Sequence, residues 1–222
     1  MSLTAPVGRG SDLTDEFDPQ PTLDSRVMFE GMIFDVRRDT VDLGAGGVVE
    51  RDYIEHPGAV VIVALRPVAG IEHVLLIRQY RHPAGGHLWE LPAGLLDVPG
   101  EPPWQAAARE LAEEVDLRAA RWHVLAESFA SPGAFPEAAR IFLARDLSAV
   151  PDGVTHERTG EEALIRPLWV PLDDAVQAVL AGRVHNASAI IGVLAAATAR
   201  SLGWATLRPH DAPWPAHPAR RG

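Results

Sequence analysis

Cysteine is absent from this sequence of 222 residues. A disulfide framework, a thiolate metal site and a cysteine nucleophile are therefore excluded. Long apolar runs are scarce as well: the longest, Ala59 to Leu65, is far shorter than the roughly 20 residues that cross a bilayer. The N-terminus also lacks the basic and then apolar pattern of a signal peptide. We therefore expect a soluble, cytoplasmic protein with no membrane partner.

Positive charge is in short supply relative to negative charge. The chain has 20 Lys and Arg against 30 Asp and Glu, which gives a net charge of −10. Most of such a surface repels a polyanion, so we expect no nucleic-acid partner. A small anionic substrate is still compatible, provided that a few placed cations or bridging metal ions hold it.

Composition divides the chain into one main domain and small appendages. With 47% hydrophobic residues, the length suits one substantial globular domain rather than two large ones. Two strand candidates, Val27 to Val41 and Val48 to Ile54, flank a glycine-rich turn and predict a small antiparallel unit. Both ends of the chain are polar or proline-rich without an apolar period, which is typical of flexible segments. The predicted segments are a flexible lead (1–22), the β unit (23–55), the main domain (56–203) and a flexible tail (204–222).

The main domain mixes strands and helices. Apolar residues recur at helical spacing from Trp104 to Val115 and predict a helix over 102–115. Two further helices are expected at 173–181 and 188–202, each followed by a glycine that ends it. Strands are expected at 59–65, 73–80, 124–129, 140–144 and 164–170. This order of strands, helix, strands and helices indicates an α+β or α/β sandwich.

The most informative segment is Arg109-Glu110-Leu111-Ala112-Glu113-Glu114, within the first predicted helix. Because each helical residue turns about 100°, Glu110, Glu113 and Glu114 fall within one arc of roughly 100°. Like charges at this spacing disfavour one another, and a divalent cation that prefers oxygen ligands would compensate. Taken alone, the same pattern also fits a solvated acidic helix surface.

The surrounding residues resemble a known motif. Gly94-Leu95-Leu96-Asp97-Val98-Pro99-Gly100-Glu101 precedes the helix, and after seven further residues the chain reads Arg109-Glu110-Leu111-Ala112-Glu113-Glu114-Val115-Asp116-Leu117. This pattern resembles the Nudix box. There are two departures: one extra residue lies between Gly94 and Glu101, and Asp116 stands where the family usually has glycine. Neither departure removes a carboxylate of the box.

Segments outside the box resemble one branch of that family, the ADP-ribose pyrophosphatases. Arg78-Gln79-Tyr80-Arg81 and Trp89-Glu90-Leu91-Pro92-Ala93-Gly94 resemble the stretches before the box, and Ser131-Pro132-Gly133 resembles the branch's proline landmark. The resemblance implies an α+β fold, the Nudix α/β/α sandwich with a mixed sheet, behind a small antiparallel β unit. It also implies Mg²⁺-dependent hydrolysis of ADP-ribose to AMP and ribose 5-phosphate.

The resemblance implies a metal site on the first predicted helix. Glu110 and Glu114 would be the main ligands of Mg²⁺ or Mn²⁺, with help from Glu113 and from the backbone carbonyl of Ala93. The general base would come from a loop after the box. Alignment with the family favours Glu161, with Glu162 as the alternative; the pair also fits an ordinary polar loop end.

Substrate contacts are implied at positions scattered along the chain. Arg51 and Arg81 match phosphate-contacting arginines of the branch, although each also fits an ordinary surface arginine of a strand. Glu90 matches an acidic position near the metals, Glu137 one near the terminal ribose, and Pro132 the landmark that favours ADP-ribose.

Other functions remain open at this point. The same chemistry would suit a nucleotide sugar, NADH or a dinucleoside polyphosphate, and a domain of this kind also occurs as a non-catalytic module that senses nucleotides. The small β unit of residues 23–55 is marginal on its own. By analogy with the branch, we expect a homodimer in which this unit completes the partner's active site.

Overall fold

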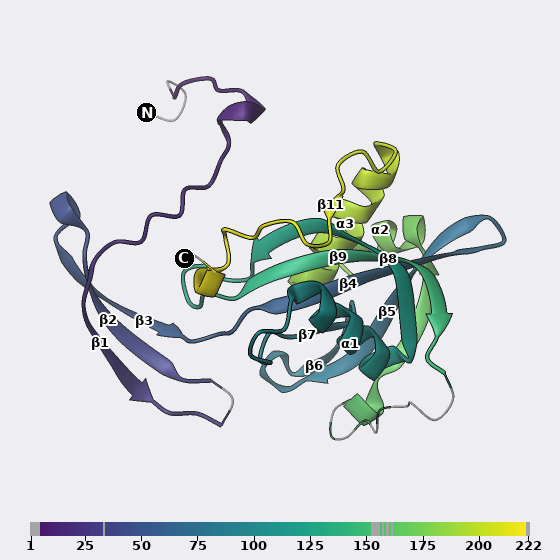
Figure 1. Ribbon diagram of the computed structural model, residues 1–222, viewed down its shortest axis with the longest axis horizontal. Helices are drawn as coiled ribbons and strands as arrows, with labels where there is room; N and C mark the ends of the chain where they lie inside the picture. The colour runs from purple at the N-terminus through teal and green to yellow at the C-terminus, as the bar shows by residue number, and fades with distance from the viewer. Residues whose placement is uncertain are drawn as a thin grey trace.

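The computed structural model describes residues 5–32, 34–151, 156, 158, 160 and 162–220. The N-terminal unit is a three-stranded antiparallel sheet of β1 (Thr22–Phe29), β2 (Val36–Asp42) and β3 (Val48–Ile54). One strand was expected over 27–41, but the chain turns at Gly31, whose N–H donates to Asp35 Oδ1 at 3.2 Å. A Cβ at Gly31 would lie 2.1 Å from the Phe34 carbonyl oxygen, so only glycine allows this turn. Figure 1 shows the sheet standing apart from the main body.

The main domain is built on a mixed eight-stranded sheet with the order β10-β5-β4-β9-β8-β11, while β6 pairs with β5 and β7 with β4. Its strands are β4 (Ala59–Val68), β5 (Ile71–Arg81), β6 (Gly86–Glu90), β7 (Ala93–Leu95), β8 (Leu117–Phe129), β9 (Ala138–Ala149), β10 (Arg166–Pro171) and β11 (Arg208–Pro209). The β4 and β9 strands are parallel and the other neighbours are antiparallel.

Helices cover both faces of this sheet: α1 (Pro103–Val115) lies on one face, and α2 (Leu172–Leu180) and α3 (Ala187–Ser201) lie on the other. Alternate residues of β4 serve the two layers, because Val60 packs in the cluster of Leu111 from α1 and Val61 in that of Val193 from α3. The apolar run of β4 is buried throughout for this reason. The predicted helices and the sandwich with its antiparallel N-terminal unit are confirmed. No helix in the described ranges is long and apolar enough to cross a membrane.

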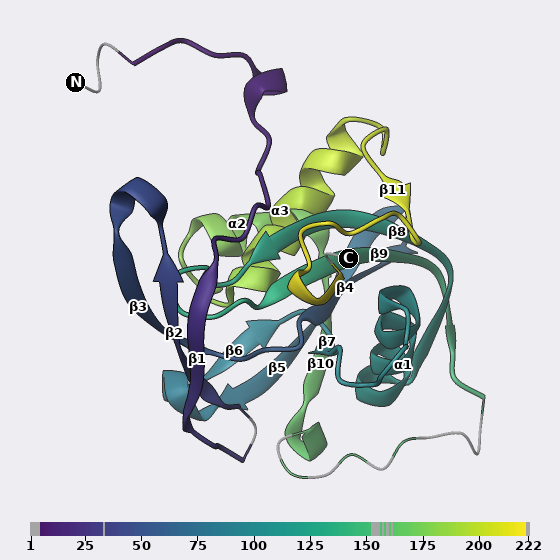
Figure 2. The same ribbon diagram turned by 60° about the vertical axis from the view of Figure 1, so that its left-hand side comes forward.

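The residues after α3 differ from the flexible tail expected from composition. They pack along the sheet, where β11 pairs with β8, and Trp214 and His217 are buried. In Figures 1 and 2 this yellow segment crosses β8 and β9 and ends beside the connection between β3 and β4. The prolines of this segment lack a backbone N–H but can still pack against the sheet. Arg140 on β9 donates hydrogen bonds to two of the segment's carbonyls, those of Ala212 and Pro213.

Candidate active site

The carboxylates of α1 face β7. Glu114 is only 8% exposed, and its Oε2 accepts a hydrogen bond from the Ala93 N–H at 3.0 Å. Burial raises the pKa of Glu114 to about 8, against the opposing effect of that hydrogen bond. Burial also raises the pKa of Glu110 to about 7, while Arg109 opposes the rise and Glu113 adds to it. The protein's own groups therefore compensate the charged forms of these two carboxylates only in part.

Gly94 makes the close approach between α1 and β7 possible. A Cβ at this position would lie 2.0 Å from Cδ of Glu110, a distance that no side chain tolerates. The glycine at the start of the box is thus required by packing: it lets a helix carboxylate lie directly against the strand backbone.

Arg109 organises the acidic face of α1. Its guanidinium binds both oxygens of Glu101, through Nε at 3.2 Å and Nη2 at 3.0 Å. Its Nη1 donates to Glu110 Oε1 at 2.6 Å and to Glu113 Oε2 at 3.1 Å. One partly buried cation therefore ties the loop before α1 to two carboxylates of the helix, which fixes their rotamers.

Arg81 and Glu90 form a second charged pair at this end of the sheet. Glu90 on β6 is 3% exposed, and Arg81 on β5 binds it in bidentate fashion at 3.0 and 2.8 Å. The charge of Arg81 also opposes the raised pKa of Glu114. Arg81 therefore lies within electrostatic reach of Glu114, and Glu90 holds it there.

The residues present fit a divalent cation. The donors are hard oxygen ligands of the kind that Mg²⁺ and Mn²⁺ prefer. The charged forms of Glu114, which is buried, and of Glu110, which is partly buried, are those that a cation would compensate. In the part of the chain that is described, no three acidic or histidine side chains converge on one point. Among these side chains, Arg109 pairs with Glu110 and Glu113, and the Ala93 N–H donates to Glu114.

The structure describes one of the two candidate general bases, Glu162, but not the other, Glu161. Glu161 lies outside the described residues. Its neighbour Glu162 is partly buried and begins a short 3₁₀ helix, Glu162–Leu164, just before β10. The charge of Glu162 contributes to the raised pKa of both Glu110 and Glu114. The start of this short helix therefore lies within electrostatic reach of the helix carboxylates.

Arg51 lies away from this cluster. It is exposed on β3, and its Nη1 donates to the backbone carbonyl of Glu50 at 2.8 Å. Both views show β3 in the separate N-terminal sheet, apart from α1 (Figures 1 and 2). Within one chain, the structure does not bring Arg51 together with the other candidate residues.

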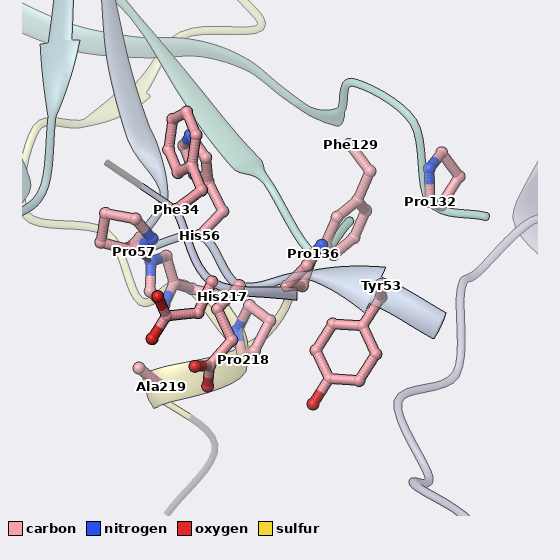
Figure 3. Close-up of a pocket in the computed structure, with 12 residues that line it drawn as sticks. Phe34, Tyr53, His56, Pro57, Phe129, Pro132, Pro136, His217, Pro218 and Ala219 are labelled. Carbon is pink, nitrogen blue, oxygen red and sulfur yellow. Dashed lines mark hydrogen bonds between the residues drawn. The ribbon is translucent and has the colours of Figure 1, made fainter. Parts of the chain in front are cut away.

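Pro132 lines a neighbouring cavity of about 800 Å³. Figure 3 shows Pro132 and Phe129 on one side of it, Tyr53 and His56 from the end of the N-terminal sheet, and His217 from the C-terminal segment. Burial lowers the pKa of His56, and the charge of Glu137 opposes that change. Glu137 thus lies beside the cavity rather than beside the helix carboxylates.

The cavity and the carboxylates are linked through β7. The Gly58 carbonyl, beside the cavity, accepts from the Leu96 N–H at 3.1 Å, and Ala59 pairs with Leu95. Ala93 and Gly94 at the other end of β7 contact Glu114 and Glu110. Both regions thus contact the same short strand.

Sequence reasoning missed several residues of the site. His56 and Tyr53 line the cavity, and the His56 ring stacks on that of Phe34 with centroids 5.4 Å apart. Arg158 donates through Nε to the Glu113 carbonyl at 2.8 Å. No local pattern marks these residues, since their partners come from segments far apart in the sequence.

Comparison with known proteins identifies the family. The sequence model of the NUDIX domain matches residues 55–190. The chain is 45% identical to the ADP-ribose pyrophosphatase of Mycobacterium tuberculosis over 193 residues, which cover 87% of this chain and 90% of that protein. It is 30% identical to the ADP-ribose pyrophosphatase of Bacillus subtilis, over 76% of this chain and 87% of that protein. The chain therefore belongs to the Nudix family, as predicted, and is a Nudix hydrolase.

A solved structure supports the fold. The crystal structure of an ADP compounds hydrolase superposes with a TM-score of 0.68 at 21% sequence identity, covering 86% of this chain and 99% of that one. The likeness includes the mixed sheet between helices. The two relatives named above, from Mycobacterium tuberculosis and Bacillus subtilis, are both named as ADP-ribose pyrophosphatases.

Proposed function

We propose that this protein hydrolyses the diphosphate bond of ADP-ribose and releases AMP and ribose 5-phosphate. The observation that carries this proposal is the 45% identity to an ADP-ribose pyrophosphatase over most of both chains. Buried Glu114 beside Ala93 and partly buried Glu110 beside Gly94 support the same chemistry. Water adds across the diphosphate: one phosphorus gains its oxygen, the bridging P–O bond to that phosphorus breaks, and the other phosphate keeps the bridging oxygen.

Glu110 and Glu114 are the proposed main ligands of Mg²⁺ or Mn²⁺, with Glu113 and the Ala93 carbonyl assisting. Bound there, the cations supply charge neutralisation of the diphosphate and a more acidic water. Arg109 keeps Glu110 and Glu113 in place through its hydrogen bonds, so it acts as a positioning residue.

The general base is proposed to be Glu161, with Glu162 as the alternative. The influence of Glu162 on the pKa values of Glu110 and Glu114 supports a base in this part of the chain. Either carboxylate would accept the proton of the attacking water. Arg81, held by Glu90, would meet the diphosphate, and Pro132 and Glu137 would contact the ribose end from the cavity.

We further propose that the active unit is a homodimer in which Arg51 reaches the partner's substrate. Every residue of β1 is exposed, including the apolar side chains of Leu23, Val27, Met28 and Phe29. Such a face favours a covering surface. Because Arg51 is far from α1 in its own chain, a second copy is the simplest route by which it meets a diphosphate.

A substrate panel tests the proposed function. Purified protein with Mg²⁺ is incubated separately with ADP-ribose, ADP-glucose, NADH and a diadenosine polyphosphate, and the products are identified by chromatography. We expect AMP and ribose 5-phosphate from ADP-ribose at a rate well above the others, and no turnover after chelation. Faster hydrolysis of another compound would assign the enzyme to that substrate instead.

A further inference from the structure

The C-terminal residues 212–219, called here the C-terminal strap, bind directly to the main sheet. Arg140 on β9 is 2% exposed, and its Nη1 and Nη2 donate to the carbonyls of Ala212 and Pro213 at 2.7 and 2.9 Å. Its Nε donates to Glu127 at 2.9 Å, and its guanidinium lies 4.5 Å from the ring centre of Trp214. A buried guanidinium needs such partners, so Arg140 and the strap stabilise each other.

The strap then reaches the hinge, His56 to Gly58, which joins the N-terminal sheet to the main domain. His217 is 4% exposed and its Nε2 lies 3.0 Å from the Pro57 carbonyl oxygen. Because a carbonyl only accepts, Nε2 carries the hydrogen and donates it. A Cβ at Gly58 would lie 2.4 Å from this nitrogen, so the hinge and His217 meet closely only because Gly58 has no side chain.

The strap also forms part of the cavity described above. His217, Pro218 and Ala219 line it opposite Phe129 and Pro132 (Figure 3). The described lining residues are mostly aromatic and proline rings, with the carboxylates of Asp35 and Glu55 and without Lys or Arg. This chemistry suits an uncharged ring that donates hydrogen bonds, such as a base or a sugar, and it disfavours a phosphate.

We propose that the C-terminal strap is a wall of the substrate pocket, and that His217 is a positioning residue that holds the hinge in the binding geometry. The strap touches the hinge and the cavity, whereas the carboxylates of α1 are held by Arg109 and Ala93. Losing His217 therefore weakens substrate binding and leaves the chemical step intact. The inference rests on the proposed function only for the identity of the substrate.

The test separates binding from turnover. KM and kcat for ADP-ribose with Mg²⁺ are measured for the full chain and for His217→Ala, together with hydrogen exchange of the peptide over residues 55–60. We expect KM to rise roughly tenfold, the scale of one lost buried hydrogen bond, with kcat near that of the wild type. Exchange at the hinge should become faster. His217→Gln should have a KM and a rate of hinge exchange closer to those of the wild type, because its amide Nε2–H can donate to the Pro57 carbonyl.

His210, two residues before the strap, offers a matched control. Both histidines pack on a tryptophan: the ring centre of His217 lies 4.7 Å from that of Trp214, and the ring centre of His210 lies 5.0 Å from that of Trp104. His210 does not line the cavity. His210→Ala should change neither KM nor hinge exchange. Wild-type KM and wild-type hinge exchange in His217→Ala would overturn the proposal, as would equal effects in both variants. If ADP-ribose is not hydrolysed at all, the proposed function fails. The same comparison is then made with the compound that is turned over.

Discussion

Arg158 and Asp116 form an ion pair at the C-terminal end of α1, with Nη2 lying 2.7 Å from Oδ2. Asp116 caps this helix in the left-handed region, with φ of 55°. Arg158 also donates to the Glu113 carbonyl, one residue before Glu114. The departure from the family's usual glycine thus provides a contact between α1 and a residue only four positions before Glu162.

Replacing Asp116 by glycine should separate catalysis from stability. Glycine suits the left-handed backbone, so the melting temperature of Asp116→Gly should stay equal or rise. Arg158 loses its ion pair but keeps its hydrogen bond to the Glu113 carbonyl, and kcat should fall by about two- to fivefold, the scale of a partly exposed ion pair. Asp146→Gly is the control: Asp146 also has a positive φ, of 56°, and pairs with Arg121, but contacts no candidate site residue. A kcat for Asp116→Gly equal to that of Asp146→Gly would refute a positioning role.

Glu110→Gln and Glu114→Gln should each keep the fold and lose most activity. Glutamine preserves the shape of each side chain but removes a charged ligand of the cation. We expect kcat/KM to fall by about 100-fold or more with ordinary Mg²⁺, the scale of losing an essential catalytic group. Circular dichroism checks the fold. Turnover equal to that of the wild type in either variant would contradict the ligand assignment.

The stability of the metal-free protein should fall as pH rises. Glu110 and Glu114 have folded-state pKa values of about 7 and about 8, above the ordinary value of 4.5, because burial disfavours their charged forms. Their contribution to stability is therefore fully present below about pH 4.5 and is lost as pH rises through 7 and 8. Melting temperatures in a chelator at pH 6 and pH 8.5 measure this loss.

The Glu110→Gln, Glu114→Gln double variant isolates these two groups from all others. Its melting temperature in chelator should depend less on pH than that of the wild type between pH 6 and 8.5. Mg²⁺ should restore stability to the wild type at pH 8.5 and leave the double variant almost unchanged, since a ligand stabilises only the state it binds. An identical pH dependence in both proteins would show that these carboxylates are not held at raised pKa values.

Much of the acidic site was predictable because it is local in sequence. Glu110, Glu113 and Glu114 share a helix face, and periodicity alone places them together. Gly94 shows what local patterns do not reveal. Only glycine fits at this position, because a Cβ would collide with Glu110, which lies on a different element. The C-terminal strap was unpredictable for the same reason. The strap packs on the sheet through hydrogen bonds from Arg140 to two of its carbonyls. The composition of the strap does not indicate a contact with a strand that is distant in sequence.

Glu161→Gln should lower turnover by roughly 100-fold or more, the usual contribution of a general base, with little change in metal affinity. Glu162→Gln should have a smaller effect, because alignment with the family places the base on Glu161. Single-turnover kinetics at saturating Mg²⁺ measure the step, and titration of Mn²⁺ measures metal affinity. The reverse order of effects would place the base on Glu162, whose charge is felt by Glu110 and Glu114.

Mixing two damaged variants should restore activity if the active site is shared between subunits. In the proposed dimer, each active site combines Arg51 of one chain with Glu110 of the other. One variant, Arg51→Ala, lacks the arginine, and the other, Glu110→Gln, lacks the metal ligand. A two-fold heterodimer then has one intact site, so complete exchange should give about a quarter of wild-type activity. Light scattering should report a dimer, and the interface should bury well over ~2,000 Å², as obligate dimers do.

Exchange itself must be shown independently, for instance by mass spectrometry of isotopically labelled chains. Glu110→Gln mixed with Glu114→Gln serves as the control, because both changes fall on the same helix and every site in the heterodimer keeps one defect. Recovery in the first mixture alone would place Arg51 over the partner's carboxylates. A monomer at working concentration, or no recovery despite proven exchange, would contradict the shared active site. Arg51 would then have no diphosphate to contact, since it lies apart from α1 within its own chain.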